Sequence, residues 1–293
     1  MPNRSAQPGR SYLYVPGHRA DRHEKALVSG ADDVIVDLED AVPADAKDEA
    51  RRACAALLAG GPSSGARVWA RVNAHPAHLA DDLAAVVSPA LTGIWVPKAE
   101  PALLAEVDER LTALERAAGL AEGSTAVIAL IETAVGVLHA EEVGRSPRVV
   151  RLGIGEADLA GELRLQPDHE ANQLYGIRLA VVLASAAAGL APPVGPVEIA
   201  VRDEERLRVS TTRLLRQGFR ARTALHPRQI PVINEVFTPT AEEVAEAREL
   251  LAVLDEAQRR GQATAVDAKG RLVDPAVVRG AQEILDRYAG RAT

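Results

Sequence analysis

Short runs rich in apolar and β-branched residues alternate with longer runs rich in Ala, Leu, Glu and Arg along most of this chain. Neighbouring parallel strands need a crossover connection, which is usually a helix, so this alternation predicts βαβ units and a parallel sheet. The expected strands are Ser11–Val15, Asp33–Leu38, Arg67–Val72, Gly93–Pro97, Thr125–Ile131, Val149–Ile154, Val194–Glu198 and Arg222–Leu225. Segments with helical spacing lie between them, among them Ala46–Leu58, Ala102–Ala118, Asn172–Ala188 and Asp203–Gln217.

Eight such units within about 230 residues are typical of an α/β fold of the (β/α)8 or TIM-barrel kind. A doubly wound open sheet is the alternative, but no Gly-x-Gly-x-x-Gly follows the first expected strand. Hydrophobic residues make up 47% of the chain and aromatic residues only 3%. We therefore expect Ala, Val and Leu to fill the core.

The alternation stops after Leu225. The segment Ala241–Arg260 predicts one long helix, Gly261–Lys269 a loop, and Pro275–Tyr288 a final helix. We therefore expect a TIM-barrel domain over residues 1–238 and a C-terminal helical extension over residues 239–293. This extension could cover the mouth of the barrel or pack on a neighbouring subunit.

Charge and hydropathy exclude several classes of partner. The net charge of −7 argues against a nucleic-acid binder, which normally carries a basic face. The start of the chain lacks the apolar run of a signal peptide, and the longest apolar run, Leu179 to Ala191, is too short to span a bilayer. Cys54 is the only cysteine, which suits a reducing compartment. We expect a cytoplasmic protein with no nucleic-acid or membrane partner.

Polar residues gather where the expected strands end. In a TIM barrel the chemistry lies at the C-terminal ends of the strands, so these residues should meet at one mouth. The strand ends carry "VPGHR" (15–19), "DLED" (37–40), "RVN" (71–73), "PK" (97–98), "IET" (131–133), "GIGEAD" (153–158) and "HP" (226–227).

Most of these residues, taken singly, also have a purely structural interpretation. Asp40 or Asp158 could cap the helix that follows. Arg71 could form a salt bridge at the rim, and Lys98 could be a solvated strand end. Glu132 is different, because it follows an apolar run and should be buried, and a buried carboxylate needs a partner or a metal.

Taken together, the strand ends predict a site of definite chemistry. Four carboxylates face two basic side chains: Glu39, Asp40, Glu132 and Asp158 lie opposite Arg71 and Lys98. Oxygen ligands without a cluster of Cys or His suit a hard cation such as Mg²⁺. A Mg²⁺ beside an arginine makes a site for a small α-keto or α-hydroxy acid, since the metal polarises a carbonyl and the guanidinium binds a carboxylate.

The chain resembles the citrate lyase β-subunit-like family of the HpcH/HpaI aldolase superfamily. The resemblance covers nearly the whole chain, with its motifs in the family's order. They are "RSYLYVPG" (10–17), "VIVDLEDAV" (34–42), "RVN" (71–73), "VPKAE" (96–100), "LIETAVGV" (130–137), "GIGEADLAGEL" (153–163) and "ALHPRQIPVINEVFTP" (224–239).

The resemblance implies a TIM barrel with one Mg²⁺ bound by Glu132 and Asp158. It implies that Glu39 and Asp40 bind the waters of the metal, and that Arg71 holds the carboxylate and carbonyl of the keto-acid half. Lys98 is then a further substrate-binding residue. Arg19, with Arg22 and Lys25, is a candidate contact for the phosphates of coenzyme A, although the three could equally form a solvated helix face.

The stretch "VDAKGRLVDPAVV" (266–278) lies outside the barrel. Arg271-Leu272-Val273 could pair briefly as a strand, and Asp274 followed by Pro275 is a good start for the final helix. The stretch also resembles the C-terminal segment of the acyl-CoA-active branch of the family. That resemblance implies that Asp274 is the acid/base residue and enters a neighbour's site, so we expect a homotrimer.

The resulting functional hypothesis is a Mg²⁺-dependent carbon–carbon lyase of Claisen or aldol type that acts on a β-hydroxyacyl-CoA such as malyl-CoA or citramalyl-CoA. The reverse condensation, thioester hydrolysis, a pyruvate-class aldolase on free acids, and a carrier-dependent subunit of a multi-protein citrate lyase remain open, with a non-catalytic scaffold as the last alternative. The chain departs from the family pattern at Gly195, where an acid is expected, and at "RARTALHP" (220–227). These departures leave the acyl group open.

Overall fold

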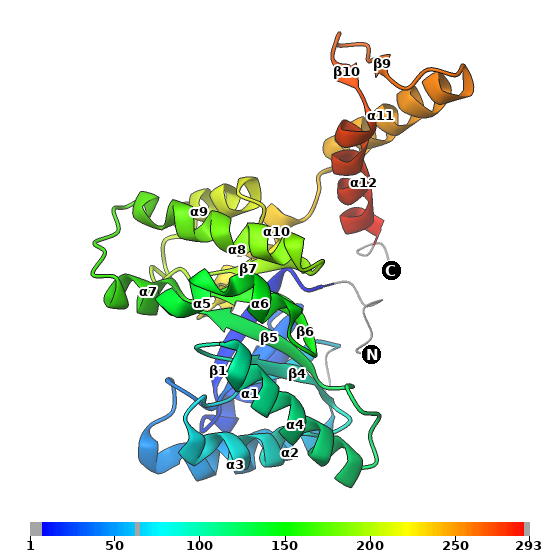
Figure 1. The fold of residues 1–293 in the computed structure, drawn as a ribbon. Coiled ribbons are helices and arrows are strands. Elements are labelled where there is room, and N and C mark those ends of the chain that lie inside the picture. The colour runs from blue at the N-terminus through cyan, green and yellow to red at the C-terminus, as the bar shows by residue number, and fades with distance from the viewer. Residues whose placement is uncertain (1–7, 62–64, 290–293) are drawn as a thin grey trace. The chain divides into compact units, whose positions relative to one another are not determined.

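The computed structural model describes residues 8–61 and 65–289. Eight parallel strands close into a barrel in sequence order, and helices surround it (Figure 1). The strands are β1 (Ser11–Pro16), β2 (Asp33–Asp37), β3 (Arg67–Arg71), β4 (Leu91–Val96), β5 (Ala126–Ile131), β6 (Val149–Ile154), β7 (Ala191–Gly195) and β8 (Ala221–Ala224). The predicted (β/α)8 barrel is confirmed.

The helices follow the alternation read from the sequence. Around the barrel lie α1 (Ala20–Leu27), η1 (Ala44–Ala46), α2 (Lys47–Gly60), α3 (Pro76–Val86), α4 (Pro101–Ala117), α5 (Ala134–Leu138), α6 (Ala140–Arg145), α7 (Glu156–Glu162), η2 (Asn172–Leu174), α8 (Tyr175–Ala187), α9 (Glu204–Arg216), η3 (Pro227–Gln229) and α10 (Ile230–Phe237). None of the helices in the described residues is long and apolar enough to cross a membrane.

Strand β7 begins and ends three residues before the predicted Val194–Glu198. Proline has no backbone N–H to donate to a ladder and is uncommon inside sheets. The structure nevertheless includes both prolines in the strand, and the carbonyl of Pro192 accepts a hydrogen bond from Arg151 Nε at 2.5 Å. Gly195 therefore ends the strand and packs against helix α9, where a Cβ would approach Leu214 Cδ1 to 2.7 Å.

Ala, Val and Leu make up most of the buried core, as expected, but aromatic side chains occupy the centre of the barrel. Both tryptophans, Trp69 and Trp95, are buried there with Tyr12, and the partly buried Tyr14 packs against them. Their rings pack edge to face or tilted, with centroids 5.4 Å apart for Tyr12–Trp95 and 6.3 Å apart for Tyr12–Trp69. Large rings of this kind bury much surface, so these four residues account for much of the packing at the barrel centre.

Strands β2 and β3 carry matching charges at both ends. Their register places Asp33 beside Arg67 and Asp37 beside Arg71. Positions four apart on a strand point to the same side, so both pairs face the same way as the intervening Trp69. The Nη2 atoms of the arginines lie 2.7 Å from Asp33 Oδ2 and 2.7 Å from Asp37 Oδ2 respectively. The middle of the lumen is apolar, and an ion pair lies at each of its ends.

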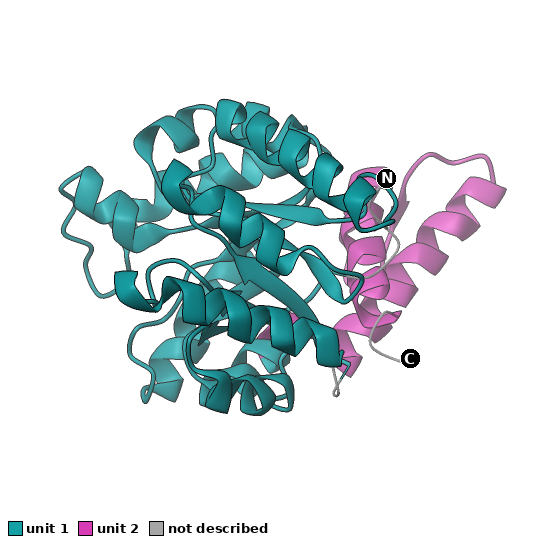
Figure 2. Cartoon of the chain, turned by 90° about the horizontal axis from the view of Figure 1, so that it is seen from below, with its two compact units in different colours: residues 1–235 teal, residues 236–293 magenta. Residues whose placement is uncertain are grey.

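The chain divides into two compact units, residues 1–235 and 236–293, coloured separately in Figure 2. The second unit contains α11 (Ala241–Arg259), the short strands β9 (Ala265–Val266) and β10 (Leu272–Val273), and α12 (Pro275–Ala289). The brief pairing expected around Leu272 is confirmed, since β10 pairs with β9 in antiparallel fashion. Asp267 organises this hairpin by accepting hydrogen bonds from the backbone N–H groups of Lys269 and Arg271.

Gly93 tests how tightly the barrel centre is packed. A Cβ at this position would lie 2.3 Å from the carbonyl oxygen of Ala126 and 2.6 Å from the ring of Trp69. We expect Gly93→Ala to lower the free energy of unfolding by about 1–3 kcal/mol, the usual cost of overpacking a core. Denaturant unfolding measures this change. Gly176→Ala, at a helical position with open space, is the control and should leave stability nearly unchanged. An equal effect of both substitutions would contradict the prediction.

Candidate active site

A pocket of about 660 Å³ opens at the C-terminal ends of the strands. Of the residues predicted from the strand ends, it brings together Asp40, Arg71, Glu132 and Asp158. Lys98 and Arg19 do not line it. The structure therefore brings these four predicted residues together at one mouth of the barrel.

Arg71 is fixed by its neighbour on β2. Its Nε donates to Asp37 Oδ1 at 2.8 Å and its Nη2 donates to Asp37 Oδ2 at 2.7 Å. The guanidinium also lies 5.0 Å from the ring centroid of Tyr14. The Nε–Nη2 edge, which best matches a carboxylate, is thus occupied by Asp37. Only the Nη1 side remains for a substrate, so a two-point grip by Arg71 on a substrate carboxylate is not available in this arrangement.

Asp37 is a site residue that the sequence reading did not select. Besides pairing with Arg71, it accepts hydrogen bonds from the backbone N–H groups of Glu39 at 2.9 Å and Ala41 at 3.0 Å. It thereby shapes the turn that presents Glu39 and Asp40. The signal for Asp37 is the matched spacing of "DVIVD" and "RVWAR", which aligns an acid with an arginine at both ends of adjacent strands.

Glu39 is buried beside two positive groups without being fully satisfied. Its Oε2 lies 2.8 Å from Arg71 Nη1 but accepts no hydrogen bond, and its Oε1 lies 4.0 Å from Lys98 Nζ. Burial raises the pKa of Glu39 from 4.5 to about 7, with Arg71 opposing the shift and the charges of Asp40 and Asp37 adding to it. Despite these two cations, burial dominates, and Oε2 is left without a hydrogen bond.

Glu132 follows β5 directly and is buried, as predicted. Its Oε1 accepts a hydrogen bond from the backbone N–H of Lys98 at 2.9 Å. Its Oε2 has no hydrogen bond within the described chain and lies against Gly155, where a Cβ would come within 2.5 Å of it. Burial raises the pKa of Glu132 to about 8, and the charges of Glu39 and Asp158 raise it further.

Asp158 and Asp40 are not capping residues in this structure. Asp158 lies exposed in the first turn of α7, whose N-cap makes no side-chain hydrogen bond. Asp40 is 67% exposed, and its Oδ2 lies 3.8 Å from Arg71 Nη1. Both side chains thus remain open to the pocket.

The donor set at the mouth fits a hard divalent cation with an incomplete protein shell. The register of β5 and β6 pairs Ile131 with Ile154, so Glu132 and the start of α7 follow at the same level. Within residues 8–61 and 65–289, no three acidic, histidine or cysteine side chains stand together as a complete metal site. Mg²⁺ typically takes one or two carboxylates and completes its shell with waters and ligand oxygens. Glu132 Oε2 and the carboxylate of Asp158 can supply the protein's share.

Arg19 and Asp274, which were predicted from the resemblance, have local partners. The guanidinium of Arg19 binds both oxygens of Asp21 at 2.8 Å on the exposed start of α1. Asp274 belongs to the second unit, where its Oδ1 accepts hydrogen bonds from the N–H groups of Ala276 and Val277 at 2.9 Å. Its capping role at α12 is therefore confirmed.

A second charged network lines the same pocket near β6 to β8, and the sequence reading did not identify it. Arg178 binds Glu156 at 2.5 and 2.8 Å, and Glu198 lies 3.1 Å from Arg206 and 3.5 Å from Arg222. Burial lowers the pKa of Arg222 to about 10. The predicted strand Val194–Glu198 includes Glu198, whereas the observed β7 ends at Gly195, so Glu198 lies in the loop after the strand. The mouth thus has an acidic side and a side rich in arginine.

The chain is similar to known proteins over nearly its whole length. The chain is 33% identical to L-malyl-CoA/beta-methylmalyl-CoA lyase of Cereibacter sphaeroides, over 97% of this chain and 96% of that protein. It is 36% identical to (3S)-malyl-CoA thioesterase of the same organism, over 92% and 90% respectively. Its fold is similar to the crystal structure of CitE from Mycobacterium tuberculosis in complex with magnesium, acetoacetate and coenzyme A, with a TM-score of 0.78, 30% identity, and coverage of 98% and 99%.

Residues 10–227, which span the barrel from β1 to the end of β8, match the family described as HpcH/HpaI aldolase/citrate lyase. The match includes the acidic residues and the arginine at the mouth. The chain belongs to the HpcH/HpaI aldolase/citrate lyase family.

Proposed function

We propose that this protein is a Mg²⁺-dependent carbon–carbon lyase that acts on a β-hydroxyacyl-CoA such as malyl-CoA or citramalyl-CoA. The observation that carries the proposal is the placement of Arg71. Asp37 fixes its guanidinium so that Nη1 remains at the mouth, beside the buried Glu39 and in the same pocket as Glu132 and Asp158. The similarity to a malyl-CoA lyase and to a CitE structure with magnesium and coenzyme A supports the same chemistry.

In this proposal Glu132 and Asp158 hold the metal, and Glu39 and Asp40 orient its waters. A bound Mg²⁺ would polarise the oxygen on the carbon that carries the substrate's hydroxyl or carbonyl group. Arg71 Nη1 donates a hydrogen bond to the carboxylate or to that oxygen, which a fixed cation can stabilise without reorganising. The exposed Lys98 contributes positive charge at the rim.

Cleavage breaks the bond between the hydroxyl-bearing carbon and the carbon next to the thioester. The hydroxyl releases its proton to the solvent in the mouth as it becomes a carbonyl. The electron pair of the broken bond passes to the carbon next to the thioester, which then takes up a proton. We assign this second proton to Asp274, which acts as an acid in cleavage and as a base in condensation. Asp37 has a positioning role, because it acts on the substrate only through Arg71.

Asp274 lies in the second unit, so we propose that it enters the mouth of a neighbouring subunit in a homotrimer. The Asp267 hairpin and the packing of α11 on α12 hold the segment that carries Asp274 in a defined position within its unit. We also propose a contact between Arg19 and the phosphates of coenzyme A, and a cytoplasmic location, which suits the free and buried Cys54.

The function is tested by incubating the purified chain with malyl-CoA and citramalyl-CoA, with and without Mg²⁺. A lyase produces acetyl-CoA together with glyoxylate or pyruvate. Thioester hydrolysis is the second candidate, favoured by the 36% identity to a malyl-CoA thioesterase, and it produces free coenzyme A and a hydroxy acid. Turnover of free acids alone, or only of a carrier-bound thioester, would contradict the proposal.

Gly155→Ala is predicted to weaken Mg²⁺ binding without removing a charge. The new methyl group would push against Glu132 Oε2, the oxygen that we assign to the metal. Displacing a ligand in this way should lower Mg²⁺ affinity by about 10- to 100-fold, as changes around metal ligands typically do. Calorimetric titration measures it, with Glu132→Ala as the fully disabled reference.

The matched control for this variant is Gly161→Ala, in the helix that begins after Gly155 but facing open space. It should bind Mg²⁺ like the parent protein. Equal Mg²⁺ affinity in Gly155→Ala and the parent would remove Glu132 from the metal site.

Thermal stabilisation by Mg²⁺ should increase with pH. Because the folded-state pKa of Glu132 is raised from 4.5 to about 8, the metal-free protein loses stability as pH rises through this window. Mg²⁺ displaces the proton and binds best to the ionised carboxylate. At a fixed Mg²⁺ concentration the rise in Tm should therefore be larger at about pH 8.5 than at about pH 6. The Glu132→Gln variant should lose most of this difference, and equal increments at both values would contradict the prediction.

Asp274→Asn is predicted to slow turnover by about a hundredfold or more, the usual contribution of a general acid or base. Asn still caps α12, so folding and Mg²⁺ affinity should remain normal. Arg71→Lys should also be nearly inactive, because an ammonium cannot bind both Asp37 oxygens in the planar geometry of a guanidinium.

Mixing these two inactive variants tests whether the site is shared between subunits. Mixed trimers contain some sites with both residues intact, so activity should partly return. Full activity of Asp274→Asn, or an active monomer, would refute the assignment of Asp274.

A further inference from the structure

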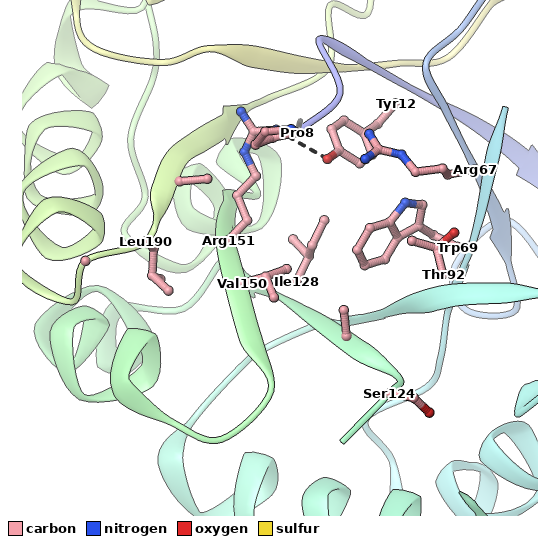
Figure 3. A pocket seen from close by; sticks show the side chains of 13 residues that line it. Pro8, Tyr12, Arg67, Trp69, Thr92, Ser124, Ile128, Val150, Arg151 and Leu190 are labelled. Atoms are coloured by element: carbon pink, nitrogen blue, oxygen red, sulfur yellow. Dashed lines mark hydrogen bonds between the residues drawn. The ribbon is translucent and has the colours of Figure 1, made fainter. Parts of the chain in front are cut away.

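A second cavity, of about 400 Å³, lies at the opposite end of the barrel from the mouth (Figure 3). Its lining residues come from the N-terminal ends of strands β1 and β3 to β7 and from the segments just before them. One side presents the aromatic rings of Tyr12 and Trp69, and the other presents the aliphatic side chains of Ile128, Val150 and Leu190. The volume and the mainly apolar lining suit a small organic molecule.

Arg151 gives this cavity a specific polar group. Its side chain lines the cavity although the residue is only 2% exposed. Nε donates to the carbonyl of Pro192 at 2.5 Å, and Nη1 donates to the carbonyl of Gly9 at 2.8 Å and to the hydroxyl of Tyr12 at 3.3 Å. Figure 3 shows the contact between Arg151 and Tyr12 beside the cavity.

These partners leave the charge of Arg151 uncompensated. Carbonyl and hydroxyl oxygens accept hydrogen bonds but carry no net charge, and Arg151 forms no ion pair with any described carboxylate. Nη2 has no hydrogen bond among residues 8–61 and 65–289. It is also not among the fully buried polar atoms that lack a partner. A guanidinium cannot lose its proton at ordinary pH, and a buried charge normally has a partner of opposite sign.

Arg67, which also lines the cavity, differs from Arg151 in this respect. Its Nη2 donates to Asp33 Oδ2 at 2.7 Å, and Asp33 is satisfied further by the indole N–H of Trp69 at 2.8 Å. The acid nearest the cavity is therefore engaged by other groups. No carboxylate of this cluster is therefore left to pair with Arg151.

We propose that the cavity at the N-terminal end of the barrel binds a small organic anion, a carboxylate attached to an aromatic or compact apolar body. The carboxylate pairs with Arg151, and the body packs between Tyr12, Trp69 and the aliphatic wall. This site is separate from the mouth, because none of its lining residues lines the pocket that contains Arg71.

The test is a fluorine NMR titration of the full chain with para-fluorophenylacetate, compared with the neutral para-fluorophenylacetamide. The acid should bind at least about tenfold more tightly than the amide, a difference of about 1.4 kcal/mol, because only the acid supplies the countercharge. Equal affinities, or no binding of the acid, would overturn the proposal.

Three variants locate the probe. Arg151→Gln should lose the preference for the acid. Val150→Phe narrows the cavity but keeps Arg151, so it should weaken the binding of the acid even if Arg151→Gln fails to fold. Arg71→Lys should bind the acid like the parent protein. Binding that survives Val150→Phe unchanged, or that disappears in Arg71→Lys, would place the probe elsewhere and refute the site.

Discussion

The ion pair between Asp37 and Arg71 is the interaction on which the mouth of the barrel depends. Both side chains are largely buried, and the pair uses two parallel hydrogen bonds, the geometry that best repays the cost of removing charges from water. Removing either partner would leave the other charge buried and alone. The same carboxylate holds the turn that carries Glu39, so the position of the guanidinium and the shape of the acidic loop are set together.

The aromatic column gives this ion pair a rigid support. Tyr14 lies under the guanidinium of Arg71 and packs against Trp95, which in turn packs against Tyr12 at the far end of the lumen. These rings fill the barrel centre with side chains that have few rotatable bonds, so little freedom remains for Arg71 to shift. Both ends of the lumen are therefore linked by direct ring contacts.

The sequence predicted the repeating features of the fold well and its exceptions poorly. Alternation between strands and helices reflects burial, so the barrel and most strand ends could be read directly. Strand β7 lies three residues before its predicted position. Prolines are uncommon inside sheets, and only tertiary contacts decide that Pro192 and Pro193 belong to this strand. Asp37 was overlooked although it lies in the same motif as Glu39, since the register that pairs it with Arg71 is a property of two strands rather than of one. The pairing of Glu198 with distant arginines was invisible for the same reason.

The acidic side of the mouth carries negative charge that the predicted metal would compensate. Glu39 and Glu132 are both buried, the charge of Glu39 helps to raise the pKa of Glu132, and each has an oxygen without a hydrogen bond in the described chain. A core selected only for stability would avoid this arrangement, because burying like charges together is costly. Nearby Gly155 leaves room at the oxygen of Glu132, where any side chain would collide. The unfavourable charge and the preserved space occur at one point, and a bound divalent cation accounts for both.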